Sequence, residues 1–595
     1  CEGAAEGTST VSIAGSGPPT KLGAGNVTSN TANSFTGLTT IGQGTLTLAN
    51  GGIPGSVTVD SQGTLAGNGT IGGSLTIGGG LFLSGVSNAA SLSALPSANA
   101  FRRSAITTFA AGDAPALIVN GDLIANTGSR LAFAVTPSGA TPILVNGRAT
   151  LAGSRFDVTI NDPNPSRNAT YTALKALGGL SVTNTSATSP STSILPVLTQ
   201  SQNTLLLTIL NLNVPTTGIA TSPNGKAAGL GIDAVKRCTP GDLCDVVGEV
   251  LTLNGNELDA ALVDLAGEIH ASQLRLQVTD SRMVTDLVRS QLADFDHDSE
   301  ENPIYRQRGK RPRWWLQFTG GHSNYDSGEL SGATSNIGGS GGGFDFKPAG
   351  NWTIGGGGSF SFGNLSLTEI SGSTNVKAPR AFGYSSVGFG PFHFHGGGSA
   401  AKTKNDTKRD IRFAASVPDE NGNHVPLGDG VDREAESDQS GDVEDGWTEL
   451  EHTQNWTEWT LDSKAGWRTA RFGRDAFNES GAGAISLEGD ATSLVSHESH
   501  FEVHLFKKTG GWRPRMLVTY RREFGDDVTT ADVNFENRPD SQFQVSGLPI
   551  PRNTFNGLFG LTVQSQIGLQ YIFEYETQQA SGESHHAFHF RMRFK

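Results

Sequence analysis

The second half of the chain consists of short runs in which every second residue is apolar. From Arg313 onward, side chains such as Trp314, Leu316 and Phe318 alternate with small, polar or charged ones. A period of two predicts β-strands. A soluble β-sandwich shares this alternation, but here one face is rich in aromatic residues while the other carries Arg, Glu and His. That division is typical of a membrane barrel with lipid outside and water inside.

The connections between these runs are alternately tight and long. Outer-membrane barrels show this alternation because the turns at one end stay tight while the surface loops at the other end are free to grow. Eleven runs alternate clearly, and a twelfth, less regular candidate lies within 447–460. Because single-chain bacterial barrels have an even number of strands, we predict an antiparallel transmembrane barrel of twelve strands over residues 313–595. The long connections are expected at 364–377, 404–446, 474–493 and 525–552.

Acidic residues crowd the longest of these connections, between Asp419 and Asp445. We expect this segment to be an outward-facing surface loop. Two interpretations stay open: a solvated disordered segment, or a loop that repels or selects partners at the cell surface.

The polar faces of the predicted strands supply candidate residues for a barrel lumen. We expect the arginines to oppose Glu574 and Glu576 in a charge network that holds a helix, although solvation of a water-filled interior explains the same residues. The histidines could bind a metal ion, but hydrogen bonds to a helix or water suit a polar wall better. The predicted lumen-facing residues are Arg313, His393, His395, His500, Glu502, His504, Arg513, Arg515, Arg521, Glu574 and Glu576.

One long helical stretch precedes the barrel. From Ala260 to Leu292, apolar residues recur every three to four positions with charged residues between them. About 20 residues rising 1.5 Å each would cross a membrane of roughly 30 Å. We therefore predict a pore helix at about 260–295, within a linker of residues 231–312, that runs through the barrel lumen. A soluble amphipathic helix packed elsewhere is the alternative.

Residues 36–85 follow a different pattern. Short strands such as 45–48, 56–59 and 74–77 recur amid many glycines. This spacing predicts the coils of a right-handed parallel β-helix, in which each coil stacks on the next. We assign residues 1–114 to these repeats, and similar short strands continue to about residue 210.

Composition narrows the function. No run of about 18 apolar residues is present, so a helical membrane protein is excluded. The net charge of -14 argues against nucleic acid as a partner. Cys238 and Cys244 flank a turn-like Pro-Gly pair and are expected to form a small disulfide loop, with two free thiols as the alternative. Cys1 is either a lipidated mature N-terminus or an arbitrary start.

Histidine is missing from the upstream region, since all 13 lie at position 270 or later. A Ser-His-Asp or Cys-His site therefore cannot be built within residues 1–230. A glycosidase-like carboxylate pair stays open, but Asp beside Gly or Pro is typical of turns. The carboxylates that could form such a pair are Asp113, Asp122, Asp157 and Asp162. We expect no catalytic activity, no cofactor and no metal site in this chain.

Two motifs carry a family resemblance. The segment Leu265-Ala266-Gly267-Glu268-Ile269-His270-Ala271-Ser272, followed by Asp280-Ser281-Arg282, resembles the linker-helix signature of monomeric (type V) autotransporters, which include pertactin-like adhesins. Residues 63–73 resemble the family's passenger-associated repeat. The linker motif comprises Gly267, Glu268, His270, Ser272, Asp280, Ser281 and Arg282.

The resemblance implies a passenger exported through or beside its own barrel. Residues 115–230 would then be the capping, autochaperone region of the passenger, and Phe590 and Phe594 would form the C-terminal assembly signal. Lys595 departs from the family by following that terminal Phe, and the helix lacks the paired Asn at which some members cut themselves.

The implied location is the Gram-negative outer membrane, with the passenger on the cell surface for adhesion or surface structure. The implied partners are outer-membrane lipid, the barrel-assembly machinery, periplasmic chaperones and a host or cell-surface ligand. Two alternatives stay open: a translocator whose catalytic domain lies upstream of Cys1, and a helix-gated outer-membrane channel.

Overall fold

A computed structural model describes residues 7–9, 15–29, 33–83, 116–136, 139–140, 142–162, 166, 168–239, 241–253, 255–301, 312–418, 424–426, 429–565 and 569–594. The expectations for Cys1, Asp113 and Lys595 lie outside these residues. The chain forms two compact units. The first comprises Cys1–Pro215, Lys236–Leu253 and Ala414–Val431, and the second comprises Thr216–Val235, Asn254–Phe413 and Asp432–Lys595.

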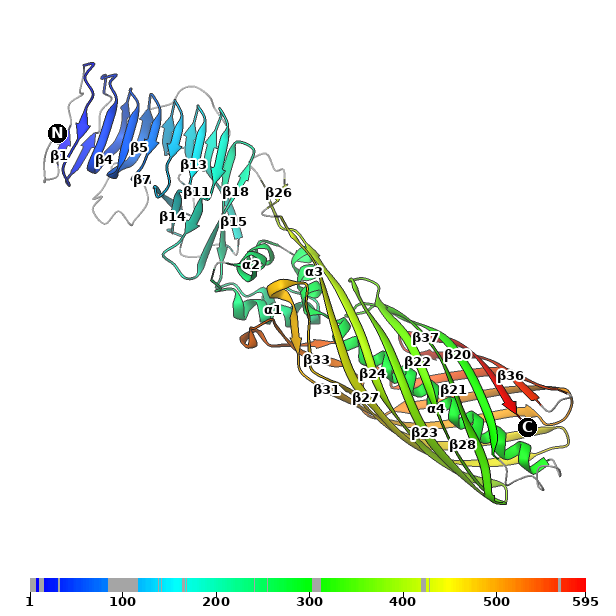
Figure 1. The fold of residues 1–595 in the computed structure, drawn as a ribbon. Helices are drawn as coiled ribbons and strands as arrows, with labels where there is room; N and C mark the ends of the chain where they lie inside the picture. The colour runs from blue at the N-terminus through cyan, green and yellow to red at the C-terminus, as the bar shows by residue number, and fades with distance from the viewer. Residues whose placement is uncertain are drawn as a thin grey trace. The chain divides into compact units, whose positions relative to one another are not determined.

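The first unit is a stack of coils whose strands pair in parallel. Its two longest strands, β4 (Thr39–Ile53) and β5 (Val57–Ile71), lie side by side along most of their length. The other strands are β1 (Gly7–Ser9), β2 (Thr20–Lys21), β3 (Asn26–Ser29), β6 (Leu75–Ile77), β7 (Gly80–Leu83), β8 (Leu117–Val119), β9 (Leu123–Ala125), β10 (Arg130–Thr136), β11 (Gly139–Ala140), β12 (Ile143–Val145), β13 (Ala149–Ala152), β14 (Arg155–Ile160), β15 (Asn168–Ala176), β16 (Leu180–Thr183), β17 (Ser186–Thr188), β18 (Ile194–Ser201) and β19 (Thr204–Asn211) (Figure 1).

Columns of apolar side chains run through this stack. In one column Ile53, Ile71, Val119, Val145 and Ala176 are paired in register from coil to coil. Each is at most 2% exposed. Burying such a side chain contributes roughly 1.5–3 kcal/mol, less for alanine. Each coil is therefore stabilised mainly by the coils above and below it.

Close contact between coils accounts for the glycine-rich sequence. Gly67 has a φ of 91°, and a Cβ there would lie 2.0 Å from the carbonyl oxygen of Leu48 in the next coil. Only glycine fits this backbone without strain.

Antiparallel pairing ends the stack. Strands β18 and β19 form a hairpin, and β19 also pairs antiparallel with β15. The first unit also contains α2 (Asp242–Thr252) and the hairpin of β25 (Ser416–Pro418) and β26 (His424–Pro426). Cys238 and Cys244 form a disulfide beside α2, with Cα atoms 5.6 Å apart.

The second unit contains a closed antiparallel barrel of twelve strands, which confirms the predicted number and topology. The first strand, β20, pairs with the last, β37. In order around the barrel the strands are β20 (Arg313–Tyr325), β21 (Ala333–Ala349), β22 (Trp352–Leu367), β23 (Gly372–Phe389), β24 (Phe392–Phe413), β27 (Val431–Asn455), β28 (Trp459–Arg474), β31 (Thr492–Lys507), β32 (Trp512–Glu523), β35 (Asn553–Gln564), β36 (Leu569–Ala580) and β37 (Glu583–Phe594).

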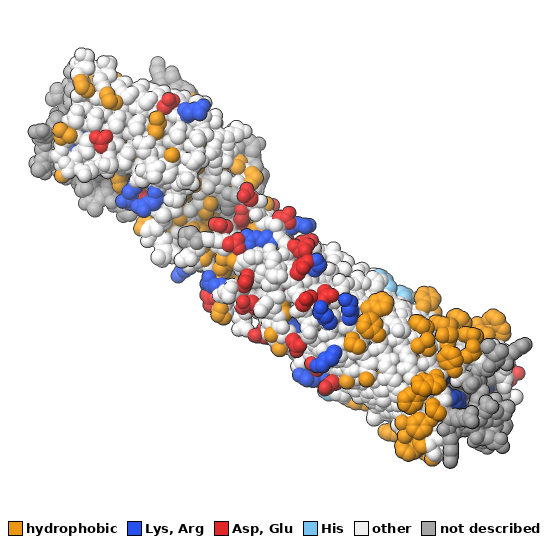
Figure 2. All heavy atoms as spheres, viewed as in Figure 1, with side chains coloured by type: hydrophobic (Ala, Val, Ile, Leu, Met, Phe, Trp, Pro, Cys, Tyr) orange, Lys and Arg blue, Asp and Glu red, His pale blue; other side chains and the backbone are white. Residues whose placement is uncertain are grey.

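The outer surface of the barrel divides into two zones. Figure 2 shows hydrophobic side chains gathered over one part of the barrel and charged side chains over the part beyond it. Exposed aromatic residues such as Phe318, Phe360, Phe392, Phe559 and Phe588 make the hydrophobic zone. This zone lies toward the tight-turn end of the strands. The charged zone lies toward the long-loop end.

The predicted acidic loop is wrong over most of its length. Residues 431–445 belong to β27, a strand of 25 residues, and β24 extends to Phe413. Acidic residues occupy alternate, outward-facing positions of β27, including Asp432, Glu434 and Glu436. Beyond the lipid zone the outer wall faces water. The period of two persists there, but its outer face is charged instead of aromatic.

The predicted continuous helix from Ala260 to Leu292 is also wrong. Helix α3 (Gly255–Ala266) ends before Gly267, whose φ of 71° breaks the helix, and α4 (Ile269–Glu301) follows. A glycine in this left-handed region is a common helix terminator. Helices α2 and α1 (Pro223–Val235) were not predicted from the sequence. None of the helices in the described residues is long and apolar enough to span a membrane.

A small sheet lies at the long-loop end of the barrel. It contains β29 (Phe477–Asn478), β30 (Leu487–Gly489), β33 (Thr530–Phe535) and β34 (Phe543–Ser546). Helix α1 packs on β34 and on α3. Three short 3-10 helices complete the described elements: η1 (Thr216–Gly218), η2 (Gly483–Ile485) and η3 (Pro539–Ser541).

Candidate functional site: a helix held in the barrel lumen

Helix α4 occupies the lumen of the barrel (Figure 1). It packs against β22, β23, β24 and β28. Every residue from Ile269 to Leu292 whose side chain is polar, apart from Asp286 and Ser290, is at most 9% exposed. A helix on a protein surface would leave one polar face in water. The wall of the barrel therefore surrounds α4 on all sides.

Near the tight-turn end, Arg289 of α4 lies in a cage of carboxylates. Its guanidinium is 2.6 Å from Glu449 and 3.1 Å from Glu502, both on the wall. Lys464 adds a second cation, 3.4 Å from Glu502 and 3.2 Å from Glu451. Buried charges of this kind are tolerated because each is paired with groups of opposite charge.

At mid-height, the linker motif contacts the wall directly. Asp280 pairs with Arg380 at 2.8 Å. The Ser281 hydroxyl donates to Asp445 at 2.5 Å and accepts from Arg468 at 2.6 Å. Arg282 pairs on the opposite side with Glu498 at 2.9 Å and Glu523 at 3.2 Å. Three consecutive residues of α4 thus bind three sectors of the wall.

At the long-loop end, His270 is enclosed by the chain segments that follow β28. It lies 2.6 Å from Glu479 and stacks on Phe477, with ring centroids 4.1 Å apart. Arg409 forms a two-pronged pair with Glu479 at 2.7 and 2.8 Å. Burial opposes ionisation of Glu479, but the charge of Arg409 and the hydrogen bonds outweigh it and lower its pKa to about 2. Arg474 donates to the carbonyl of His270 at 2.9 Å.

Glu268 lies between α3 and α4, beside the break at Gly267. It accepts hydrogen bonds from the Asn224 amide of α1 at 2.8 Å and from the backbone N–H of Ser331 at 3.1 Å. Burial raises the pKa of Glu268 to about 7, and the two donors offset only part of this rise. The same amide of Asn224 donates to the carbonyl of Ser546, so Asn224 links Glu268 to β34. The hydroxyl of Ser272, another residue of the motif, accepts from the N–H of Leu548 at 3.1 Å.

The predicted lumen residues all lie on inward-facing positions of their strands. Two of them contact α4: Glu502 pairs with Arg289, and Arg521 pairs with Asp286 at 2.6 Å. The rest form contacts along the wall. Among the histidines, His393 and His395 are each 3.5 Å from Glu451, His500 is 3.1 Å from Glu449 and His504 is 3.8 Å from Asp462. Arg515 is 3.3 Å from Glu574, Glu576 is 2.9 Å from His589, and Arg513 donates to the Lys508 carbonyl. Arg313 is half-buried.

Most wall residues that hold α4 were missed. Arg409 and Asp445 lie in the segment 404–446 that was expected to be a loop, and Glu449 lies in the irregular run after it. The alternation of buried and exposed positions in β27 was the available signal. It was masked because the outward residues there are acidic. Among the described residues, no group of three or more His, Cys, Asp or Glu side chains is arranged to hold a metal ion.

Residues Phe590 and Phe594 face outward on β37. Phe590 packs against Phe318 of the first strand and against Phe573 of β36, with centroid distances of 6.4 and 5.1 Å. These contacts lie at the seam where the barrel closes.

Comparison with known proteins gives a family for the barrel. Residues 314–576 match the family model described as the autotransporter beta-domain. No curated protein sequence matches the chain. Among solved structures, the translocator domain of autotransporter NalP from Neisseria meningitidis is 14% identical, with 53% of this chain and 98% of that chain covered and a TM-score of 0.40.

Two further structures are similar at comparable levels. The beta domain of the Bordetella autotransporter BrkA is 13% identical, with 48% and 98% covered and a TM-score of 0.33. The transport unit of AIDA-I from Escherichia coli is 13% identical, with 48% and 90% covered and a TM-score of 0.31. The family model and the closed barrel around a linker helix together identify the C-terminal part of this chain as the β-domain of an autotransporter of the Gram-negative outer membrane.

Proposed function

We propose that the barrel exports residues 1–230 as a β-helical passenger and then anchors them at the cell surface through α4. The observation that carries this proposal is the dense set of ion pairs between α4 and the wall. Arg289 pairs with β27 and β31, Asp280 with β23, and Arg282 with β31 and β32. Helix α4, which leads the chain into the first barrel strand, is thereby retained in the lumen as a fixed tether.

Folding of the passenger outside the cell would make export irreversible. The β18–β19 hairpin closes the last coil and offers a template on which the preceding coils can stack. Each added coil buries several apolar side chains, at roughly 1.5–3 kcal/mol for each large one. Sliding back through the pore would require those side chains to be exposed again. The linker motif, Phe590 and Phe594 would act in assembly with the barrel-assembly machinery and periplasmic chaperones.

The passenger is proposed to serve adhesion or surface structure, without catalysis. It contains no histidine, the usual base of a nucleophilic catalytic site. A host or cell-surface ligand would bind along these coils. A catalytic domain encoded upstream of Cys1 would instead make this chain the translocator part of an enzyme.

The test is a deletion of residues 115–210 in cells that carry an epitope tag near the N-terminus. We expect the barrel to assemble, as judged by heat-modifiable migration on gels, while the remaining passenger stalls or becomes sensitive to added protease. The matched control deletes residues 84–114, between β7 and β8. Unchanged surface display and protease resistance after the 115–210 deletion would refute the proposed role of the capping region.

A further inference from the structure

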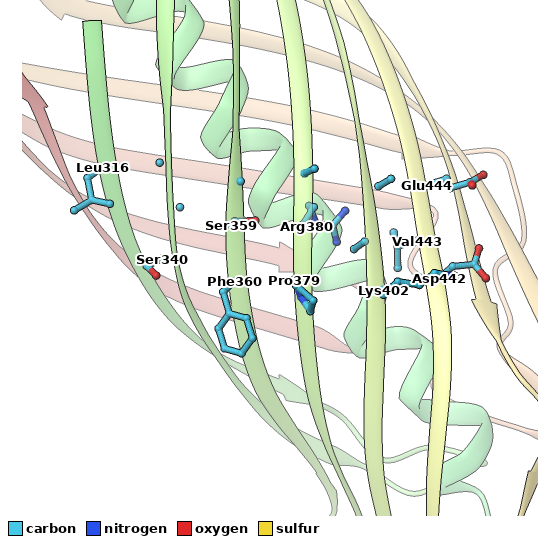
Figure 3. A pocket seen from close by; sticks show the side chains of 16 residues that line it. Leu316, Ser340, Ser359, Phe360, Pro379, Arg380, Lys402, Asp442, Val443 and Glu444 are labelled. Carbon is cyan, nitrogen blue, oxygen red and sulfur yellow. The ribbon is translucent and has the colours of Figure 1, made fainter.

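The outer wall of the barrel carries an amphipathic hollow on one side, where β20 to β24 and β27 lie next to each other. It consists of two adjoining depressions that share Phe360. The upper depression, toward the long-loop end, has a volume of about 650 Å³, and its lining combines three asparagines, Lys377 and Asp406 with Phe360, Phe362 and other apolar or small residues. The lower one, toward the tight-turn end, has a volume of about 880 Å³ and is lined largely by small and apolar residues (Figure 3).

The strand register arranges the lining in rows that run across neighbouring strands. The uppermost row is polar: Asn336, Asn364, Asn375 and Asp406 are paired in turn from β21 to β24. His322 of β20 extends it and hydrogen-bonds Asn336 at 2.9 Å. Asn336 donates to Asn364 at 3.3 Å. Each of these side chains faces away from the lumen.

The next row combines aromatic and cationic groups. Phe362, Lys377 and Lys404 are paired in sequence across β22, β23 and β24. The side chains of Lys377 and Lys404 are 59% and 60% exposed, and both approach the single carboxylate of Asp406, at 3.8 and 3.7 Å. Two ammonium groups sharing one carboxylate leave net positive charge at this level.

The lowest row consists of glycine and alanine apart from Leu316 at its edge. Leu316, Gly342, Gly358, Ala381 and Ala400 are paired in turn across five strands. The exposed ring of Phe360 lies on β22 between Gly358 of this row and Phe362 of the cationic row. Small residues at consecutive positions across a lipid-facing wall leave a furrow into which a hydrocarbon chain can fit.

Polar, cationic, aromatic and small-residue rows thus follow one another from the water zone into the lipid zone. Outer-membrane barrels point their long loops outward, so the cationic row lies at the outer leaflet. Amides and carboxylates bind sugar hydroxyls, ammonium groups bind phosphate, and aromatic rings bind apolar faces. We propose that this hollow is a binding site for a phosphorylated glycolipid of the outer leaflet, of the lipopolysaccharide class.

In the proposed complex, the sugar lies against Asn336, Asn364 and Asn375. A phosphate lies between Lys377 and Lys404, and an acyl chain follows Phe360 into the furrow over Gly358 and Ala381. At the far edge of the furrow Lys402 faces outward beside Asp442 and Glu444 of β27. These two carboxylates disfavour a second phosphate on that side, so the glycolipid phosphate is directed to the Lys377–Lys404 pair.

The test is native mass spectrometry of the purified full chain in detergent, with bisphosphorylated lipid A as the probe. The same lipid without phosphate and phosphatidylglycerol serve as comparison lipids. We expect lipid A to be retained at least about tenfold better than either, a difference of about 1.4 kcal/mol. Lys377→Gln combined with Lys404→Gln should lower retention by about tenfold, and Asn364→Ala should lower it less.

Lys408→Gln is the matched control, because Lys408 faces outward on the same strand as Lys404 but pairs with Glu434 and Glu436 beyond the hollow. Heat-modifiable migration verifies that each variant is folded. Equal retention of phosphatidylglycerol would overturn the proposal in favour of a general anionic-lipid surface. Unchanged lipid A retention in the folded double variant would overturn it outright.

Discussion

Arg289 provides the sharpest test of how the barrel holds its helix. Its side chain is 5% exposed and lies within 3.1 Å of Glu449, Glu502 and Asp286. Arg289→Gln would remove the cation and leave the two wall carboxylates with Lys464, which is 3.4 Å from Glu502 and 3.9 Å from Glu449. Breaking a buried ion pair by removing one partner costs about 3–5 kcal/mol. Because Lys464 remains, we expect Arg289→Gln to lower the free energy of unfolding by about 3 kcal/mol, at the lower end of this range.

The assay is urea unfolding of the full chain in detergent micelles, monitored by tryptophan fluorescence and by gel migration. A double-mutant cycle with Glu502→Gln separates the pairwise energy from the cost of leaving a charge unpaired. We expect a coupling energy above about 1 kcal/mol. Arg289→Lys should restore part of the stability, because lysine keeps the charge but cannot contact both glutamates in the same planar geometry.

The matched control is Arg471→Gln. Arg471 lies on the barrel strand β28, its side chain is 55% exposed, and it faces outward, 4.0 Å from Asp442. A surface pair of this kind contributes about 0–1 kcal/mol. If Arg289→Gln costs no more than Arg471→Gln, and the coupling to Glu502 is near zero, then the helix is not held by these charges.

Three further predictions follow from individual groups. First, the raised pKa of Glu268, about 7 against an ordinary 4.5, means that the folded state resists ionisation; its contribution is least unfavourable below pH 4.5, and stability on the order of 3 kcal/mol is lost as pH rises to about 7. The protection factors of the α1 amides against hydrogen exchange should therefore fall between about pH 5 and 7, and an unchanged fall in Glu268→Gln would contradict this. Second, Gly67→Ala places a methyl group against Leu48 and should make the passenger protease-sensitive while Gly128→Ala, with open space around it, affects only its own turn; equal resistance in both variants would count against tight coil stacking. Third, removing residues 260–295 should convert a closed barrel into a steadily conducting pore in planar bilayers, and porin-like conductance of the intact chain would show that α4 does not plug the lumen.

The barrel was predictable because its signal is local and repeated. Lipid outside and water inside impose a period of two, which is visible in runs such as Arg313 to Thr319 and Phe555 to Val563. The inward positions of Glu502 and Arg521 could be predicted from the alternation of apolar and polar residues along their strands alone. The coil stack was likewise visible in strands such as 74–77, since each coil repeats the same short pattern of apolar residues and glycine.

The partners of each lumen residue were not predictable. The sequence pattern places Arg289 on a helix and Glu449 in an irregular strand, but their contact depends on how the helix and that strand are rotated against each other. The acidic strand 431–445 was misassigned for a related reason. Its outward side chains face water instead of lipid, because this part of the strand extends beyond the lipid zone. Only the length of the strands in the folded barrel shows this.

The sequence by itself determined the number of barrel strands, which face of each strand points inward, and the repeating coils of the upstream unit, because these depend on interactions with the immediate solvent. The tertiary structure alone decided which charges meet, where the helix breaks at Gly267, and how rows of asparagine, lysine and glycine on separate strands align into one hollow. Those features depend on register and closure, through which residues hundreds of positions apart, such as Arg282 and Glu523, come into contact.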